Sequence, residues 1–539
     1  MSTSVRESPI WIPVQAPPEL AAGLANLSLG PNSGVDKKYQ RLLNIFHRHA
    51  LNNRRKAIRR PSAQLPGKAP KGSKKAVGKH PKAVAKVESN WEDDIISPAM
   101  IDSVLDISDN PDAKSFSQRV AKLFNQSLSI KPPLGEKDIY IERLSGALTN
   151  CVYRVTVNMA LSSASHSNAS SVKGSHTKEN GSNSLSKTYL LRVYGIGVDE
   201  FLVRNKELYW LRKLSELNIG PSLYSIYTNG RIEEYLFSDT LTKDDIRDPS
   251  TSRHIARRMC ELHYLVNFYA PHKEKTPEEQ KDPLLQGVDL SGKPDLWTNI
   301  YQWIDLVATK APGLRKICGD SPECLDIIND IDKIRKESKQ LEHFIEQINS
   351  PIVLAHSDLQ YGNILRLHKD RELVVVDFEY AGYNYRGFDI ANHFCEWMSN
   401  YHHPTHPHLL ELNRYPTQKE RYNFLRTYLK TRIFLDANKP ADRVVVESDE
   451  VSEQFISNQI SCHMVPVHIN SKYLDDQLPI IDKEVQSFIA ASHLHWGIWG
   501  LLQAYSSEID FDYVGYSAQR LTEFRRLLAD IPNTNGNEE

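Results

Sequence analysis

A short segment in the second half of the chain carries side chains suited to phosphoryl transfer. Asp358 and Asn363 lie in the stretch 356–363, which reads HSDLQYGN, and Asp377 follows the apolar run 374–376. Phosphoryl transfer to an alcohol needs the hydroxyl held in line, its proton accepted and the phosphate charge neutralised by metal ions. Mg²⁺ prefers oxygen ligands, which Asp and Asn supply. We expect Asp358 to orient and deprotonate the acceptor, and Asn363 and Asp377 to bind Mg²⁺.

The pattern H-x-D-x-x-x-x-N, followed by Asp-Phe-Glu at 377–379, resembles the catalytic and metal loops of the protein-kinase-like superfamily. H-x-D alone is common by chance, and an isolated Asp is commonly a cap or turn residue. The Asn, the expected strand pair and the strand-terminal Asp make the combination specific. Ser357 replaces the Arg of protein kinases, which argues against an activation loop controlled by phosphorylation. We expect His356 to hold the loop, and Asp389 to accept backbone hydrogen bonds from it.

A turn upstream of this segment has the position of a phosphate-covering loop. The stretch 144–150 reads LSGALTN and lies between two expected strands. We expect Ser145, Gly146, Thr149 and Asn150 to bind the nucleotide there. The turn is poor in glycine, and an ordinary hairpin loop is the alternative interpretation.

Three further features complete the expected nucleotide site. Arg192 ends an apolar strand, in the position of the usual phosphate-pairing Lys, and Glu207 on the following helix is its expected partner. The alternative is a surface ion pair of little energetic value. The stretch 233–236 is expected to connect the two lobes and to bind adenine through its backbone, at Glu234 and Leu236.

Later segments carry a more specific resemblance. The stretches 380–397 (YAGYNYRGFDIANHFCEW), 493–499 (HLHWGIW) and 511–516 (FDYVGY) closely resemble the choline/ethanolamine kinase family. With the loops above, the resemblance covers about Glu142 to Leu527, with gaps at inserts. The basic N-terminal extension and a Ser-rich insert look like those of fungal members.

The family pattern implies an aromatic cage for a small cation. A quaternary ammonium has no N–H to donate, so aromatic faces and carboxylates must recognise it. The resemblance assigns Trp496, Trp499, Tyr513 and Tyr516 to the cage. It assigns Glu396 and Asp358 to balancing the charge of the cation, and Gln360 to the lining of the site. From spacing alone, a Trp pair on one helix face is more commonly part of a core.

The resemblance implies Mg²⁺-dependent transfer of the γ-phosphoryl group of ATP to choline. This reaction makes phosphocholine and is the committed step of phosphatidylcholine synthesis by the CDP-choline pathway. Ethanolamine, the acceptor of the CDP-ethanolamine pathway, remains open, because a primary ammonium can also sit among aromatic rings. Two hypotheses of a different kind are a catalytically silent scaffold and an aminoglycoside phosphotransferase. The family also implies a homodimer.

The elements that must position these residues indicate an α+β fold with two unequal lobes, protein-kinase-like and similar to aminoglycoside phosphotransferases. Residues 95–236 are the expected nucleotide-binding N-lobe, which begins with a helical pattern between Ile95 and Phe116 and then turns to strand patterns. Helical patterns dominate 237–530, the expected C-lobe with the catalytic and choline-binding residues. Within the N-lobe, the Ser-rich stretch 160–187 is expected to be a flexible insert in a hairpin, because loop-closure entropy grows slowly with length. In the second lobe, one compact strand pair is expected at 364–367 and 373–376.

The two ends of the chain have a different composition. Residues 1–94 are rich in Pro, Ser, Gly and Lys and are expected to be disordered, as is 531–539. A basic amphipathic helix at 37–60 could touch an anionic membrane surface, with a solvated tail as the alternative. Six scattered cysteines exclude a disulfide framework, and no apolar run suits a signal peptide or a membrane span. We expect a cytoplasmic protein without a nucleic-acid partner.

Overall fold

The computed structural model describes residues 98–107, 113–130, 132–144, 150–160, 184–194, 203–217, 219–437, 470–507 and 509–531. The expected helix at 37–60, the nucleotide-binding residues Ser145, Gly146 and Thr149, and the C-terminal tail after Ile531 lie outside these residues. Among the described helices, none is long and apolar enough to cross a bilayer.

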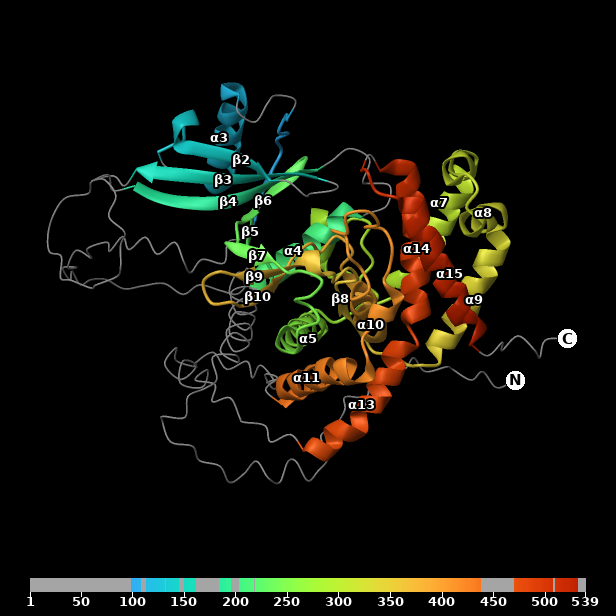
Figure 1. Ribbon diagram of the computed structural model, residues 1–539. Coiled ribbons are helices and arrows are strands. Elements are labelled where there is room, and N and C mark those ends of the chain that lie inside the picture. Colours follow the sequence, from blue (N-terminus) through green and yellow to red (C-terminus); the bar gives the residue numbers. More distant parts are fainter. Residues whose placement is uncertain are drawn as a thin grey trace, which may run out of the picture.

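The N-lobe is built on a six-stranded sheet with the strand order β1-β5-β6-β4-β3-β2 (Figure 1). Only β1 and β5 pair in parallel, and the other neighbours are antiparallel. The strands are β1 (Ala99–Ile101), β2 (Ile139–Leu144), β3 (Asn150–Ala160), β4 (Ser184–Tyr194), β5 (Leu223–Tyr227) and β6 (Gly230–Glu234). A strand therefore comes first in the described part of this lobe, although the sequence favoured a helical start between Ile95 and Phe116.

Helix α3 (Lys114–Leu128) covers one face of this sheet. The alternation of β3 places Tyr153, Val155 and Val157 on the buried face, where the Tyr153 ring centroid lies 5.3 Å from that of Phe116. Burial of a side chain such as Phe116 contributes about 1.5–3 kcal/mol. This packing gives the N-lobe a small core of its own.

Strands β3 and β4 form the predicted hairpin, paired from Asn150 with Tyr194 to Ala160 with Ser184. Residue 160 and residues 184–187, which the sequence assigned to the insert, therefore belong to the two strands. Ladder hydrogen bonds use only backbone groups, so polar Ser-containing residues can continue a hairpin that the composition alone does not reveal. Residues 161–183 lie outside the described residues.

Helix α4 (Arg204–Leu217) lies between two N-lobe strands in the sequence but packs against the C-lobe. Its apolar residues, including Leu208, Leu211 and Leu214, belong to the main core, which consists mostly of residues from the C-lobe. Lys206 on this helix also forms an ion pair with Asp295 of the C-lobe.

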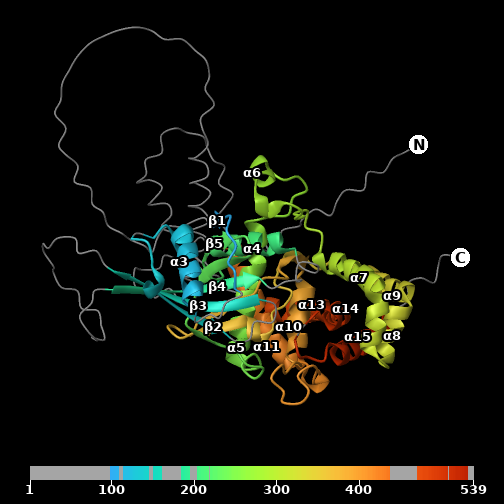
Figure 2. The same ribbon diagram turned by 90° about the horizontal axis from the view of Figure 1, so that it is seen from above.

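The C-lobe is mainly helical, as the sequence predicts. Figure 2 shows α7, α8, α9 and α15 grouped on the side of the molecule away from α3. The helices are α5 (Pro249–His263), α6 (Pro277–Gln280), α7 (Asp295–Cys318), α8 (Pro322–Asn329), α9 (Ile331–Glu346), α10 (Arg386–Glu396), α11 (Gln418–Ala437), α13 (Ser471–Gln486), α14 (Ile489–Ser506) and α15 (Tyr513–Ala529). Short 3₁₀ helices lie at Glu136–Asp138, Tyr264–Asn267, Pro283–Leu285, Tyr361–Asn363 and Leu412–Arg414.

Two small sheets are inserted among these helices. Strands β10, β9 and β7 form the first, and β11 pairs with β8 in the second. Their bounds are β7 (Ser238–Thr240), β8 (Ile352–Ala355), β9 (Ile364–Leu367), β10 (Leu373–Val375) and β11 (Gly382–Tyr385). The sequence predicted the β9–β10 pair and missed β7, β8 and β11.

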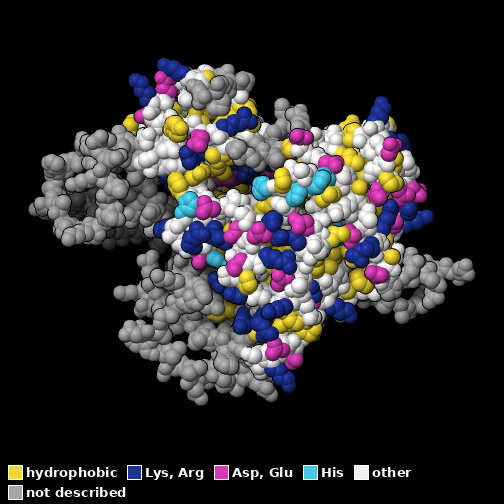
Figure 3. Space-filling model, in the orientation of Figure 1, with side chains coloured by type: hydrophobic (Ala, Val, Ile, Leu, Met, Phe, Trp, Pro, Cys, Tyr) yellow, Lys and Arg dark blue, Asp and Glu magenta, His cyan; other side chains and the backbone are white. Residues whose placement is uncertain are grey.

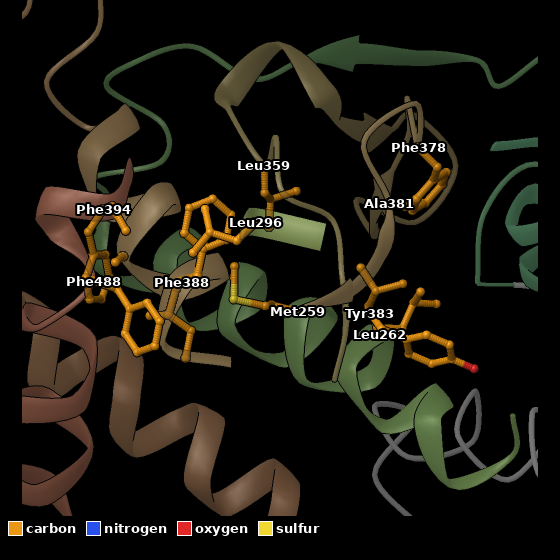
Figure 4. Packing of buried hydrophobic residues seen from close by; sticks show 14 of the residues in the cluster. Met259, Leu262, Leu296, Leu359, Phe378, Ala381, Tyr383, Phe388, Phe394 and Phe488 are labelled. Atoms are coloured by element: carbon orange, nitrogen blue, oxygen red, sulfur yellow. The ribbon is translucent and has the colours of Figure 1, made fainter. Parts of the chain in front are cut away.

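The main core surrounds the base of the loop between β8 and β9. Figure 4 shows Leu359 of this loop together with Met259 of α5, Leu296 of α7 and Phe388 of α10. All four side chains are fully buried. Because Leu359 directly follows Asp358, the packing of the core fixes the loop that carries the candidate catalytic carboxylate.

Candidate active site

The loop between β8 and β9 brings Asp358 and Asn363 together. Asn363 ends a 3₁₀ turn, and its Nδ2 donates to the backbone oxygen of Asp358 and to Asp358 Oδ2, each over 2.9 Å. The Gln360 side chain starts this turn, since its Oε1 accepts a hydrogen bond from Gly362 N over 2.7 Å. The Asn363 amide nitrogen is thus used internally, which leaves its Oδ1 as the atom that could bind a metal.

Asp389 on α10 fixes the backbone of the same loop. Its Oδ2 accepts from His356 N over 3.0 Å, and its Oδ1 accepts from Ser357 N over 2.7 Å. His263 Nε2 lies 2.8 Å from Asp389 Oδ2. Burial alone would raise the pKa of Asp389, but the hydrogen bond and charge of His263, together with His356, hold that pKa below its usual value. The expected structural role of Asp389 is confirmed.

Two further side chains of α10 reach the loop. Asn392 Nδ2 donates to Ser357 O over 3.0 Å, and His393 Nδ1 lies 2.8 Å from Leu359 O. Both side chains are fully buried, so water does not compete for these hydrogen bonds. Side chains at 389, 392 and 393 share one face of a helix, and this face therefore supports the loop.

The end of β10 lies next to this loop. His356 Nε2 lies 3.0 Å from Val376 O, and Val376 N donates to Asn363 O over 3.0 Å. The expected role of His356 in holding the loop is confirmed. Both Ser357 and Asp377 have a φ of 65°, which costs a non-glycine residue of order 1–3 kcal/mol and is typical of functional sites.

A cavity of about 220 Å³ lies between the lobes beside Asp377. Figure 3 shows the surface hollowed between the lobes, with histidine side chains gathered on one rim. The cavity lining combines apolar residues of both lobes with charged groups and the connector after β6: Leu144, Leu190, Arg192, Leu211, Pro221, Arg231, Glu233, Glu234, Tyr235, Leu236, Ser238, Leu365, Val376, Asp377 and Phe378. Of the expected nucleotide-binding residues, Arg192, Glu234 and Leu236 line it. Only the backbone of Asn150 is described, at the start of β3.

Arg192 pairs with Asp377 rather than with its expected partner, Glu207. Its Nη1 is 3.9 Å from Asp377 Oδ1, whereas the closest ion pairs of Glu207 are with Arg204, over 2.6 Å, and Arg231, over 2.7 Å. The predicted direct pair of Arg192 with Glu207 is therefore not formed. Burial raises the pKa of Glu207, but Arg231, Arg204 and, more weakly, Arg192 together hold that pKa below its usual value. Glu207 thus remains an anion within the electrostatic reach of Arg192.

Carboxyl groups gather where the loop of Asp358 meets the residues after β10. Burial, followed by the carboxylates of Glu396, Asp377 and Glu379, raises the pKa of Asp358 well above its usual value, against the hydrogen bond from Asn363. Burial and then Asp377 raise the pKa of Glu379 to about 8. Asp377 Oδ1 is buried without a hydrogen-bond partner. The group therefore favours cations, which would lower the mutual repulsion of these carboxylates.

A second group of side chains lies beside the loop. Trp496 and Trp499 on α14 have ring centroids 5.2 Å apart, and those of Trp499 and Tyr513, at the start of α15, are 5.9 Å apart. We define the aromatic cluster as Tyr380, Trp496, Trp499, Phe511, Tyr513 and Tyr516. The structure thus brings the four expected cage residues together.

Asn392 connects the aromatic cluster to the catalytic loop. Its Oδ1 accepts from Trp496 Nε1 over 2.7 Å and from Ser492 Oγ over 2.8 Å, while its Nδ2 donates to Ser357 O. One buried amide therefore uses both ends of its side chain to position the Trp496 ring and the loop that carries Asp358.

Glu396, at the end of α10, is already paired inside the protein. Its Oε1 accepts from Arg520 Nη2 over 2.9 Å, and its Oε2 accepts from Tyr401 OH over 2.7 Å. Burial raises the pKa of Tyr516; the charge of Arg520 opposes this rise, and the carboxylates of Glu396 and Asp358 add to it. Glu396 thus acts electrostatically on the same region as Asp358.

Sequence reasoning missed several residues of this region. Tyr380, whose OH accepts from Trp499 Nε1 over 2.8 Å, Tyr401 and Arg520 were not singled out, and neither was Asn392. Tyr380, Tyr401 and Arg520 contact predicted site residues. The signal available for Tyr380 was its position directly after the Asp-Phe-Glu stretch. Arg520 could have been found four residues after Tyr516, one helical turn away.

A cavity lies between the two lobes, and the loop 356–363 and the residues after β10 lie beside it. This arrangement defines a kinase of the protein-kinase-like class. The family profile described as choline/ethanolamine kinase matches residues 141–525. The chain is 30% identical over 400 residues to the choline kinase of Schizosaccharomyces pombe, covering 71% of this chain and 74% of that protein. It is 29% identical over 393 residues to the choline/ethanolamine kinase of Homo sapiens, covering 71% of this chain and 79% of the relative.

The chain therefore belongs to the choline/ethanolamine kinase family. A solved structure of an ethanolamine kinase from Plasmodium vivax supports the fold assignment, with a TM-score of 0.52 at 23% identity. That match covers 78% of this chain and 96% of the other.

Proposed function

We propose that this protein transfers the γ-phosphoryl group of ATP to the hydroxyl of choline and so makes phosphocholine. The observation that carries the proposal is the dual use of Asn392, which holds the loop of Asp358 and the ring of Trp496. A proton-accepting carboxylate and an aromatic surface for a cation are thereby fixed relative to each other, as phosphorylation of a cationic alcohol requires.

Asp358 is the proposed general base and orienting group. Its Oδ2 accepts from Asn363, so Oδ1 remains for the acceptor hydroxyl. In the transfer step, the choline oxygen forms a bond to the γ-phosphorus, the bond to the β,γ-bridging oxygen breaks, and the hydroxyl proton passes to Asp358. Without a bound cation, burial and the neighbouring carboxylates raise the pKa of Asp358. A cation beside these carboxylates would lower this pKa and favour the anionic form that accepts a proton.

The residues present fit Mg²⁺. Asp377 Oδ1 is buried without a hydrogen-bond partner. Asn363 uses its Nδ2 to hold Asp358, so its Oδ1 is available to bind the ion. An ion here would be held by these two protein oxygens together with phosphates and water. When bound, Mg²⁺ would neutralise charge between the β- and γ-phosphates.

The proposed nucleotide site is the cavity between the lobes. The apolar side chains of Leu144, Leu365 and Val376 would enclose the adenine, and the backbone at Glu234 and Leu236 would bind its edge. Arg192, now 3.9 Å from Asp377, would turn to the phosphates, because their charge exceeds that of one carboxylate.

The aromatic cluster is the proposed choline site. A millimolar dissociation constant corresponds to about −4 kcal/mol, and each desolvated cation–π contact contributes on the order of 1–2 kcal/mol. Several rings are therefore required, and Trp496, Trp499, Tyr513 and Tyr516 lie in one connected group. Gln360 is proposed to line the site through its amide nitrogen, since its oxygen caps the loop turn.

Ethanolamine is the second candidate acceptor, because the family contains kinases named for both alcohols. The test is a paired assay of the purified chain with Mg-ATP and each alcohol, with the phosphorylated product followed by mass spectrometry. We expect a higher kcat/KM for choline; a large excess for ethanolamine would reverse the assignment. The cytoplasmic location, the homodimer and the membrane contact of residues 37–60 stay predictions.

A further inference from the structure

The Glu396 carboxylate is surrounded by donors from the protein itself. The side chain is only 2% exposed, and each of its oxygens already accepts one hydrogen bond, Oε1 from Arg520 and Oε2 from Tyr401. A carboxylate has about four lone-pair sites, but burial limits access to the remaining two. A ligand with N–H groups therefore finds little hydrogen-bonding capacity on Glu396.

Arg520 places a positive charge directly beside this carboxylate. The side chain is fully buried, and its guanidinium carbon lies 5.0 Å from the ring centroid of Tyr516. Its Nε and Nη1 have no hydrogen-bond partner in the described structure, and among the described residues its ion pair is with Glu396. The pair carries no net charge, which reduces the attraction of Glu396 for a cation in the aromatic cluster.

This arrangement affects primary and quaternary ammonium groups differently. A primary ammonium gives up hydrogen bonds to water from three N–H donors when it enters a buried site, and it needs protein acceptors in return. A trimethylammonium has no donors to satisfy, and it gains from aromatic faces such as Trp499 and Tyr516 without a free carboxylate. Occupation of Glu396 by Arg520 and Tyr401 therefore penalises the primary amine selectively.

We propose that Arg520, acting through Glu396, is a specificity-determining positioning residue that makes the acceptor site favour a quaternary over a primary ammonium alcohol. The inference rests on the proposed function, since it concerns the choice of acceptor at the same site. Arg520 does not contact the acceptor itself. It controls how much charge and how many lone pairs Glu396 offers.

The test uses the purified full-length chain and four alcohols that differ only in N-methylation: ethanolamine, its N-methyl and N,N-dimethyl derivatives, and choline. We expect kcat/KM of the wild type to rise along this series. In Arg520→Met, Glu396 loses its countercharge, and the ratio of kcat/KM for choline to that for ethanolamine should fall about tenfold. Tyr401→Phe keeps the ring but frees Oε2, so the ratio should fall about threefold. Arg520→Lys keeps the charge and should stay close to wild type.

The ratio separates specificity from stability, because both values come from the same preparation and partial unfolding lowers them equally. The matched control is Arg258→Met, which removes another buried arginine that pairs with Glu261 on α5. Its ratio should equal that of the wild type. If Arg520→Met does not fold, Tyr401→Phe decides alone. An unchanged ratio in both Arg520→Met and Tyr401→Phe would overturn the inference and leave the proposed function intact. Failure of the wild type to phosphorylate any of the four alcohols would overturn both.

Discussion

The catalytic loop and the aromatic cluster lie side by side but are built on different physical principles. The loop 356–363 is held by directional hydrogen bonds from buried side chains of α10, above all Asp389 and Asn392. The cluster is held mainly by ring packing, with few hydrogen bonds, such as that of Trp496 to Asn392. Hydrogen bonds fix atoms to within tenths of an ångström, as proton transfer demands, whereas a diffuse cation tolerates looser surroundings.

The comparison predicts that damage to the loop lowers kcat and that damage to the cluster raises KM for the acceptor. Asp358→Asn should give the largest effect, because it removes the proton acceptor while preserving shape. We expect kcat to fall about 10³-fold, with KM for ATP unchanged, in steady-state assays. Asp239→Asn, at an exposed carboxylate paired with His368, is the control and should keep full activity. A loss of less than about tenfold for Asp358→Asn would rule out this residue as the base.

Asn392→Ala should affect both regions at once. It leaves Ser357 O, Trp496 Nε1 and Ser492 Oγ without their partner, and each unsatisfied buried group costs about 1–3 kcal/mol. We expect kcat to fall about 10²-fold and KM for choline to rise, with the midpoint of urea unfolding lowered as well. Ser492→Ala removes one of the three hydrogen bonds and serves as the matched control, with a smaller change in all three quantities. A change in KM alone would show that Asn392 does not support the loop.

Trp496→Phe tests the aromatic cluster separately from the catalytic loop. The exchange removes the Nε1 donor to Asn392 and part of the aromatic face of a residue that is 5% exposed. KM for choline should rise about tenfold, while kcat and KM for ATP change little, because the loop retains Asp389 and His393. Trp297→Phe, at a buried tryptophan of α7 outside the cluster, should leave KM for choline unchanged. A drop in kcat as large as that of Asn392→Ala would contradict the division of roles.

The smallest expected effect concerns stability at low pH. His495 lies on α14 beside Trp496 and is 1% exposed, and its ring centroid is 4.6 Å from that of Trp303. Burial, followed by the charge of Arg520, lowers the pKa of His495 to about 3. Between pH 6.5 and about 3, the unfolded chain binds a proton at His495 and the folded chain does not. The free energy of unfolding is therefore unaffected by protonation of His495 above pH 6.5 and falls as pH falls below that value, by at most about 1.4 kcal/mol per pH unit.

Urea unfolding at several pH values measures this effect. The free energy of unfolding of His495→Phe should fall less steeply between pH 6.5 and 5 than that of the wild type, whatever its value at pH 7.5. His343→Gln, at an exposed histidine, should have the wild-type slope. An identical slope for His495→Phe and wild type would show that His495 is not held neutral.

Local pattern predicted much of the molecule. The hairpin of β3 and β4, the β9–β10 pair and the helical second lobe follow from the period of the apolar residues and from turn residues. The motif HSDLQYGN predicted which polar side chains gather in the loop. Strand β7 escaped prediction because its three residues are all polar, whereas the equally short β10 is an apolar run. The ends of the insert escaped because backbone pairing does not depend on polarity.

The sequence by itself determined the chemical inventory: the carboxylates and the amide of one loop, the tryptophans one helical turn apart, and the family they indicate. Only the tertiary structure decided which charged side chains pair with each other. Glu207 pairs with Arg204 and Arg231 rather than directly with Arg192, and Glu396 pairs with Arg520, far away in the chain. Spacing reports neighbours on one helix or strand, such as Arg204 and Glu207 on α4. Arg231 on β6 and Arg520 on α15 lie on other elements than the carboxylates they pair with, and the packing of the core brings them together.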